Sequence, residues 1–200
     1  MIYLLLSLCF ATPRLSYEKE LEAKVMVRVL TQIEQQNHRE VQNIIDAFEK
    51  ELFPSEQLCY DVGLAYNQQG NLAQAKKYYN RAIEINPNQA SALYDRAELY
   101  LLEGKTAEAK TDLERLINQK QQHWAIYFRL AEIAAKEQDG KKMEEYLLQA
   151  IRYDMDITLL LKDPLTWKKV AKDPKLEPYL HRIFVIMAEE KLWEMLISGQ

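Results

Sequence analysis

The chain has 200 residues, of which 48% are apolar and 28% charged, with a formal net charge of -4. This is the composition of a folded globular protein, and it argues against intrinsic disorder. An acidic chain without a strong basic block is a poor nucleic-acid binder. Five Gly, three His and two Cys leave little for phosphate loops, metal clusters or a disulfide framework.

The first eleven residues have the pattern of a cleaved leader. Residues 2–10, IYLLLSLCF, form a mostly apolar run that is too short to span a bilayer. Cys9-Phe10-Ala11 fits a small-x-small cleavage motif, although no Lys or Arg precedes the run. We therefore expect residues 1–11 to be a signal peptide and the protein to be exported, to the periplasm or cell envelope of a bacterium or otherwise into the secretory pathway. The alternatives are lipidation at Cys9, with membrane attachment, and a retained apolar first helix in a cytoplasmic protein.

Residues 16–55 predict a degenerate helix pair, with helices over about 16–36 and 38–52. Each helix carries an apolar stripe at helical spacing. The stripe residues are Val29, Leu30 and Ile33 in the first helix and Val41, Ile45 and Phe48 in the second. Such atypical pairs cap the ends of helical repeats, where one face must meet water.

Residues 56–157 divide without gaps into three segments of equal length, 56–89, 90–123 and 124–157. Aligned positions agree in chemistry, which indicates a repeated helix pair. The small-residue column is Gly63, Ala97 and Ala131, and the turn column is Gly70, Gly104 and Gln138. A small residue at Gly63 lets the paired helices approach closely, and a glycine after the first helix suits a left-handed C-cap. A second helix over about 72–85 then ends at Asn86-Pro87.

The first segment, CYDVGLAYNQQGNLAQAKKYYNRAIEINPNQ, resembles the tetratricopeptide repeat (TPR) family. The second copy has Gln121 in place of the final Pro, and the third has Ala134 for the aromatic residue and Met155 for the Pro. The resemblance implies an all-α fold, a right-handed αα superhelix whose first helices line a concave groove. It also implies a protein or peptide partner in that groove.

Helical spacing selects the groove residues of each first helix. They are Tyr60, Asp61 and Leu64, then Tyr94, Asp95 and Glu98, then Phe128, Arg129 and Glu132. Tyr60, Tyr94 and Phe128 share one column and would form an aromatic ladder, which suits an interface. Asp95 and Arg129 would form either an ion pair between repeats or part of a mixed-charge strip. The chaperone-binding TPR subtype holds a C-terminal carboxylate with Lys, Asn and Arg side chains. Among the corresponding positions here only Arg129 agrees, so this subtype is disfavoured.

Residues 158–200 no longer follow the repeat and predict capping helices. Asp163-Pro164 and Asp173-Pro174 are helix-start patterns. The first predicts a helix to about Ala171, and the second a helix that continues to Ser198. We expect this segment to cover the open end of the third repeat, and Trp193 to pack back onto the body of the protein.

The sequence offers no catalytic residues, metal ligands or cofactor site. The three His share no metal-ligand spacing. Cys59 lies on a buried helix stripe, and pairs such as Glu144 and Glu145 sit on helix surfaces that we expect to be solvated. We therefore predict a non-catalytic adaptor that binds a protein segment in its groove, without nucleic acid or a small-molecule substrate. The alternative is a structural or oligomerising subunit of a larger envelope assembly, docking through its C-terminal helix.

Overall fold

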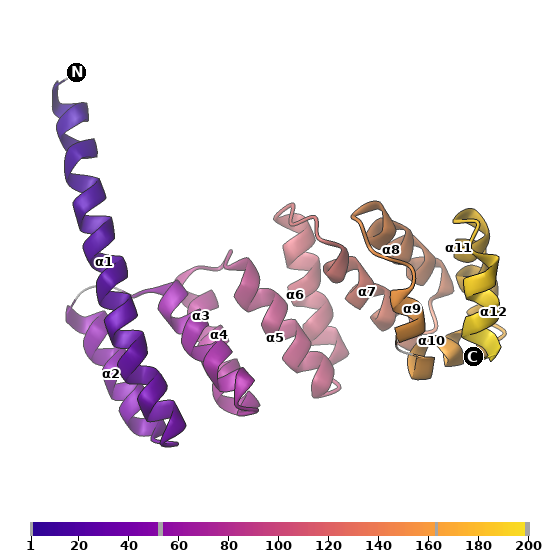
Figure 1. Ribbon diagram of the computed structural model, residues 1–200, viewed down its shortest axis with the longest axis horizontal. Helices are drawn as coiled ribbons and strands as arrows, with labels where there is room; N and C mark the ends of the chain where they lie inside the picture. The colour runs from indigo at the N-terminus through magenta and orange to yellow at the C-terminus, as the bar shows by residue number, and fades with distance from the viewer. Residues whose placement is uncertain (1, 52–53, 163, 199–200) are drawn as a thin grey trace. The chain divides into compact units, whose positions relative to one another are not determined.

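A computed structural model of the chain describes residues 2–51, 54–162 and 164–198 (Figure 1). Every regular element in those ranges is an α-helix, which confirms the all-α fold class. The chain forms two compact units, residues 1–99 and 100–200, and the boundary falls within the fifth helix. In the described ranges, no helix is both long and apolar enough to cross a membrane.

The three central segments each form one helix pair. The first helices are α3 (Glu56–Gln68), α5 (Ala90–Leu102) and α7 (Trp124–Lys136). The second helices are α4 (Leu72–Ile85), α6 (Thr106–Asn118) and α8 (Gly140–Arg152). Within each series the starts are 34 residues apart, the period of the sequence repeat.

Gly63 lies where α3 and α4 come closest. A Cβ at this position would lie 2.6 Å from Cδ1 of Tyr79 and 3.2 Å from the carbonyl oxygen of Ala75. Tyr79 is fully buried, so its ring has no free space into which to withdraw. The absence of a side chain at Gly63 is therefore what allows α4 to pack so closely, as the sequence predicted.

The turn after each first helix uses the left-handed backbone region. Gly70 and Gly104 have φ of +76° and +74°, and Gln138 has φ of +60° at the equivalent position of the third pair. In an L-residue this region costs about 1–2 kcal/mol, and glycine escapes that cost. The third turn thus keeps the geometry with a less suitable residue.

The N-terminal pair consists of α1 (Ile2–Glu34) and α2 (His38–Glu51), and α1 also contacts α3. The buried stripe of α1 is Val25, Val29 and Ile33, at intervals of one helical turn. Leu30 was predicted to belong to this stripe but is 41% exposed. It is one residue past Val29, about a quarter of a turn away from the face that meets α2.

The C-terminal segment forms α9 (Leu159–Lys162), α10 (Pro164–Lys172), α11 (Glu177–Ile186) and α12 (Glu190–Ser198). Helix α11 packs against α8, so this segment covers the third repeat as expected. The prediction of one helix to Ser198 was wrong, because Ala188 adopts φ of +56° and ends α11. Chain reversal there lets Trp193 stack on His181, with ring centroids 4.6 Å apart, and contact Phe184.

Candidate functional site

The sequence-predicted groove residues of unit 1 are carried by α3 and α5. Ser55 caps α3, its hydroxyl accepting a hydrogen bond from the Leu58 amide at 3.1 Å. The buried face of α3 is Leu58, Cys59, Val62, Gly63, Ala65 and Tyr66. Tyr60, Asp61 and Leu64 therefore fall beside this face, where each is half-buried.

Tyr60 and Asp95 join the two first helices directly. The Tyr60 hydroxyl donates a hydrogen bond to Oδ2 of Asp95 at 3.0 Å. The Tyr60 ring also stacks on Tyr79, with centroids 5.8 Å apart and planes at 28°. Held at its ring and at its hydroxyl, Tyr60 loses little side-chain entropy when a ligand contacts its exposed edge.

Burial sets the ionisation of this pair. Burial, assisted by the Asp95 carboxylate, raises the pKa of Tyr60 to about 12. Burial also raises the pKa of Asp95, while the hydrogen bond from Tyr60 opposes that change. The neutral phenol thus donates to the carboxylate, a charge-assisted hydrogen bond stronger than a neutral one.

The other groove residues predicted in unit 1 also lie on α3 and α5. Asp61 accepts a hydrogen bond from Gln57 at 2.9 Å, and burial raises its pKa. Leu64, Tyr94 and Glu98 are half-buried. The surface of α3 and α5 thus combines partly exposed rings, a leucine and carboxylates.

The predicted residues of unit 2 form a second group on α7. Arg129 forms an ion pair with Glu132 at 2.8 Å, and its guanidinium carbon lies 6.0 Å from the Phe128 ring centroid. Phe128 also contacts the buried ring of Trp167 at 5.7 Å, so the C-terminal segment holds it in place. The continuous ladder of Tyr60, Tyr94 and Phe128, which would join residues of both units, stays a prediction.

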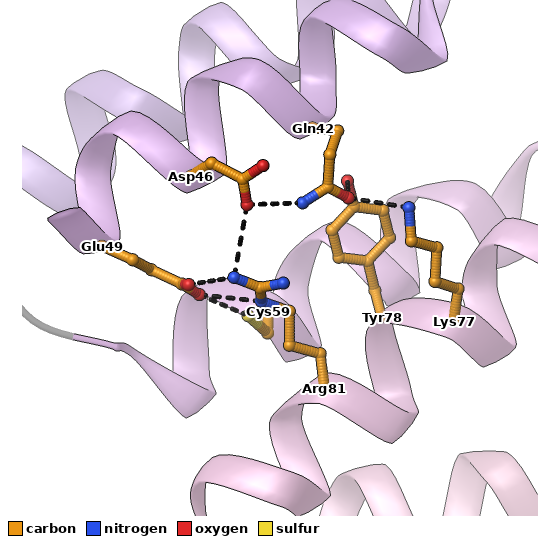
Figure 2. A network of polar contacts seen from close by, with 7 residues as sticks. All are labelled: Gln42, Asp46, Glu49, Cys59, Lys77, Tyr78 and Arg81. Carbon is orange, nitrogen blue, oxygen red and sulfur yellow. Dashed lines mark hydrogen bonds and ion pairs between the residues drawn. The ribbon is translucent and has the colours of Figure 1, made fainter.

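A polar network between α2 and α4 was missed by the sequence analysis (Figure 2). Arg81 binds Glu49 through both guanidinium Nε and a terminal nitrogen, and it reaches Asp46 at 3.3 Å. Gln42 accepts hydrogen bonds from Lys77 at 2.7 Å and from Tyr78 at 3.3 Å. Gln42, Asp46 and Glu49 follow one another at helical spacing, which was the available signal. The network fixes the N-terminal pair to the first complete repeat.

Cys59 lies at the edge of this network but is poorly suited to nucleophilic chemistry. The free thiol is buried and contacts Oε1 of Glu49 at 3.7 Å. Burial, assisted by the Glu49 carboxylate, raises the pKa of Cys59 to about 12. Because the thiolate is the reactive form, this thiol is inert at neutral pH. Among the described residues, no three His, Cys, Asp or Glu side chains are grouped to hold a metal ion.

The C-terminal helices expose a set of large apolar side chains. They are Val185, Ile186 and Met187 at the end of α11, and Met195 and Ile197 on α12. Leu196 is buried, and Trp193 packs against α11 as expected. Contiguous exposed apolar side chains, such as the run from Val185 to Met187, are typical of contact surfaces.

Two tetratricopeptide repeat models match the chain, over residues 57–89 and 78–111. Among solved structures, a tetratricopeptide repeat protein from Parabacteroides merdae superimposes with a TM-score of 0.60 at 15% identity, covering 88% of this chain and 73% of that one. YrrB, described as a TPR protein with an unusual peptide-binding site, gives a TM-score of 0.56 at 16% identity, covering 74% of this chain and 75% of its own. The chain therefore carries tetratricopeptide repeats within residues 57–111 and shares the all-α fold of tetratricopeptide repeat proteins.

Curated relatives match parts of the chain. Photosystem I assembly protein Ycf3 of Acaryochloris marina is 31% identical over 68 residues, covering 34% of this chain and 41% of Ycf3. Neutrophil cytosol factor 2 of Bos taurus is 27% identical over 123 residues, covering 54% of this chain and 23% of that protein. The chain thus spans less than half the length of either relative. The tetratricopeptide repeat is typically a non-catalytic scaffold for protein–protein interaction, and this chain carries that repeat.

Proposed function

We propose that this protein is a non-catalytic adaptor that binds a segment of a partner protein on the first-helix surface of α3 and α5. The observation that carries the proposal is the Tyr60–Asp95 hydrogen bond, which holds a partly exposed ring in one position. Rigid aromatic side chains of this kind supply much of the binding energy of protein interfaces. The names of two similar proteins, an assembly protein and a TPR protein with a peptide-binding site, support this class of function.

The surface favours an extended segment with apolar side chains and hydrogen-bond donors. Leu64 and Tyr94 offer apolar contact beside Tyr60. Asp61, Asp95 and Glu98 provide carboxylate oxygens, which accept hydrogen bonds from backbone amides or cationic side chains. Phe128, Arg129 and Glu132 would extend the binding surface if the first helices line one groove.

Crosslinked pull-down from the native cell, read by mass spectrometry, tests this proposal. The baits are the wild type, the Tyr60→Ala, Tyr94→Ala, Phe128→Ala triple variant, and Tyr17→Ala as a control at a residue that is 61% exposed on α1. Far-UV circular dichroism first establishes that each bait is folded. We expect partners that the triple variant loses and the control keeps. Identical partner sets from all three baits would refute the assignment.

Tyr60→Phe provides a gentler test of the same surface. It keeps the ring and its stacking on Tyr79 but removes the donor to Asp95. We expect it to weaken binding of any partner found by the pull-down, because Asp95 is then left partly buried without this hydrogen bond. Unchanged affinity would show that the pair is only structural.

The exposed apolar side chains of α11 and α12 favour a second function, docking in a larger assembly. Light scattering on the wild type, Ile186→Glu and Val27→Glu decides between a monomer and a self-assembling subunit. Ile186 and Val27 are 56% and 66% exposed, so the two variants are matched, and only the first lies in the C-terminal group. An oligomer that Ile186→Glu alone dissociates would support self-assembly, and a monomeric wild type would exclude it.

Export of this adaptor is part of the proposal. Thr12-Pro13, directly after the proposed cleavage position, is the N-cap and Pro pattern that begins helices. A mature chain starting at Thr12 could therefore form the rest of α1. Intact mass of the protein from its native cell would show a start at Thr12, and a start at Met1 would refute cleavage.

A further inference from the structure

A cleft of about 590 Å³ lies among α6, α7 and α8, within unit 2. Its lining consists of Glu114, Ile117 and Asn118 from α6, Tyr127 from α7, and Glu145, Tyr146 and Gln149 from α8. Ile117 and Asn118 lie three and four residues after Glu114, so the three side chains share one face of α6. None of the sequence-predicted groove residues lines this cleft.

Two tyrosines form the aromatic part of the cleft. Tyr127 is 8% exposed and stacks on Tyr153, with centroids 5.2 Å apart and planes at 17°. Tyr146 is half-buried. Burial and the nearby Glu114 carboxylate raise the pKa of Tyr146. Both phenols therefore stay neutral at physiological pH and present aromatic surface next to negative charge.

The charge of the cleft is negative. Glu114 and Glu145 are exposed, and neither forms an ion pair within the described residues. The two lysines that act on Tyr146 are held by other carboxylates, Lys110 by Glu137 at 2.8 Å and Lys142 by Asp139 at 3.3 Å. The carboxylates of Glu114 and Glu145 can therefore form ion pairs or hydrogen bonds with a ligand in the cleft.

We propose that this cleft is a second binding site, which takes Lys or Arg side chains from a basic segment of a partner protein. Carboxylates beside the partly exposed ring of Tyr146 suit a cationic side chain, because the cation gains from both the charge and the aromatic ring. Such a site would lie on α6 and α8, apart from the first-helix surface of α3 and α5. The adaptor could then hold two segments at once, with avidity greater than either contact alone.

Fluorescence anisotropy with a labelled peptide of Arg and Gly-Ser units tests the site. A matched peptide has citrulline, the neutral analogue of Arg, at every Arg position. We expect the full-length wild type to bind the Arg peptide, the citrulline peptide to bind far more weakly, and added salt to weaken the Arg complex. Absence of Arg-peptide binding, or equal binding of the citrulline peptide, would overturn the proposal.

Paired charge variants locate the binding. Glu114→Gln with Glu145→Gln should weaken the Arg peptide about fivefold, the effect of removing two partly exposed ion pairs. The control, Glu108→Gln with Glu84→Gln, removes the same charge from two exposed positions outside the cleft and should leave affinity unchanged. Equal losses in both variants would mean general attraction to an acidic protein, and this outcome also overturns the site.

Two further variants separate this site from its surroundings. Tyr146→Leu keeps an apolar side chain but removes the aromatic ring, so we expect it to weaken the Arg peptide about threefold through the lost cation–π contact. Tyr17→Leu, the same change at a 61% exposed ring of α1 outside the cleft, should leave Arg-peptide binding unchanged. An unaffected Tyr146→Leu variant, or an equal loss in Tyr17→Leu, would place the peptide elsewhere and overturn the site. Failure of the first-helix proposal would not alter these outcomes.

Discussion

Replacement of Gly63 tests how closely the paired helices pack. A Cβ there would lie 2.6 and 2.7 Å from two ring carbons of Tyr79. Carbon atoms in favourable contact are about 3.5–4.0 Å apart, so the ring or the helix must move by about 1 Å. Tyr79 is fully buried and stacked on Tyr60, and the backbone oxygen of Ala75 limits the other side.

The expected magnitude follows from two opposing contributions. Overpacking a filled core costs about 1–3 kcal/mol. Alanine gains about 1 kcal/mol over glycine in helix propensity. Gly63→Ala should therefore lower the free energy of unfolding by about 1 kcal/mol, and Gly63→Leu by about 3 kcal/mol or more. At an exposed helical glycine, by contrast, replacement by alanine would raise the free energy of unfolding, because only the gain in helix propensity remains.

Urea unfolding followed by far-UV circular dichroism measures these changes. Ala73→Leu, at an exposed position of α4, is the control for a larger side chain and should stay within about 0.5 kcal/mol of the wild type. The cost of Gly63→Ala should also shrink in a Tyr79→Leu background, where the clashing ring is absent. A Gly63→Ala variant as stable as the wild type, or more stable, would refute the close-approach argument.

The remaining predictions concern charge, backbone and ionisation. Arg81→Ala should destabilise the chain by about 1–2 kcal/mol in urea titrations, because Glu49, with a side chain only 13% exposed, loses its partner; adding Glu49→Gln should recover part of this, and no recovery would argue against a paired role. Gln138→Gly should raise stability by about 1 kcal/mol by relieving the +60° φ, and a loss of stability would contradict that reasoning. The folded state raises the pKa of Cys59 from 9.0, and that of Tyr60 from 10.0, to about 12. Both groups then bind their protons more tightly when folded, so their contribution is complete below pH 9 and is lost as pH rises toward 12. Urea midpoints at pH 8 and above 10 should show this decline, which Cys59→Ala should reduce.

The sequence determined the local architecture, because its signals are local. Helical periodicity, Gly70 and Gly104 at the turns, and Asn86-Pro87 at a helix end each act within a few residues. Their recurrence was enough to place the start of α3 and every later repeat helix. Helical spacing, together with the family resemblance, predicted Tyr60 and Asp95 as groove residues; both are half-buried, and a hydrogen bond joins them.

Other features depend on residues distant in the chain and needed the tertiary structure. Gly140, the first residue of α8, is a close-contact position, since a Cβ there would clash with the Tyr179 ring of α11. The Arg81–Glu49 pair joins helices that no local pattern relates. The cleft beside Tyr146 arises only where three helix faces meet.

Within residues 56–157, the sequence by itself therefore determined which segments are helices, where they turn and that they repeat, because backbone capping and helical spacing depend on neighbouring residues. Only the tertiary structure decided which side chains meet between helices, because those contacts depend on how whole helices pack. The chain reversal at Ala188 is an example. Alanine disfavours the left-handed backbone conformation that Ala188 adopts, so the local sequence did not predict a turn there. The turn brings Trp193 into contact with His181 and Phe184, which only the packed helices show.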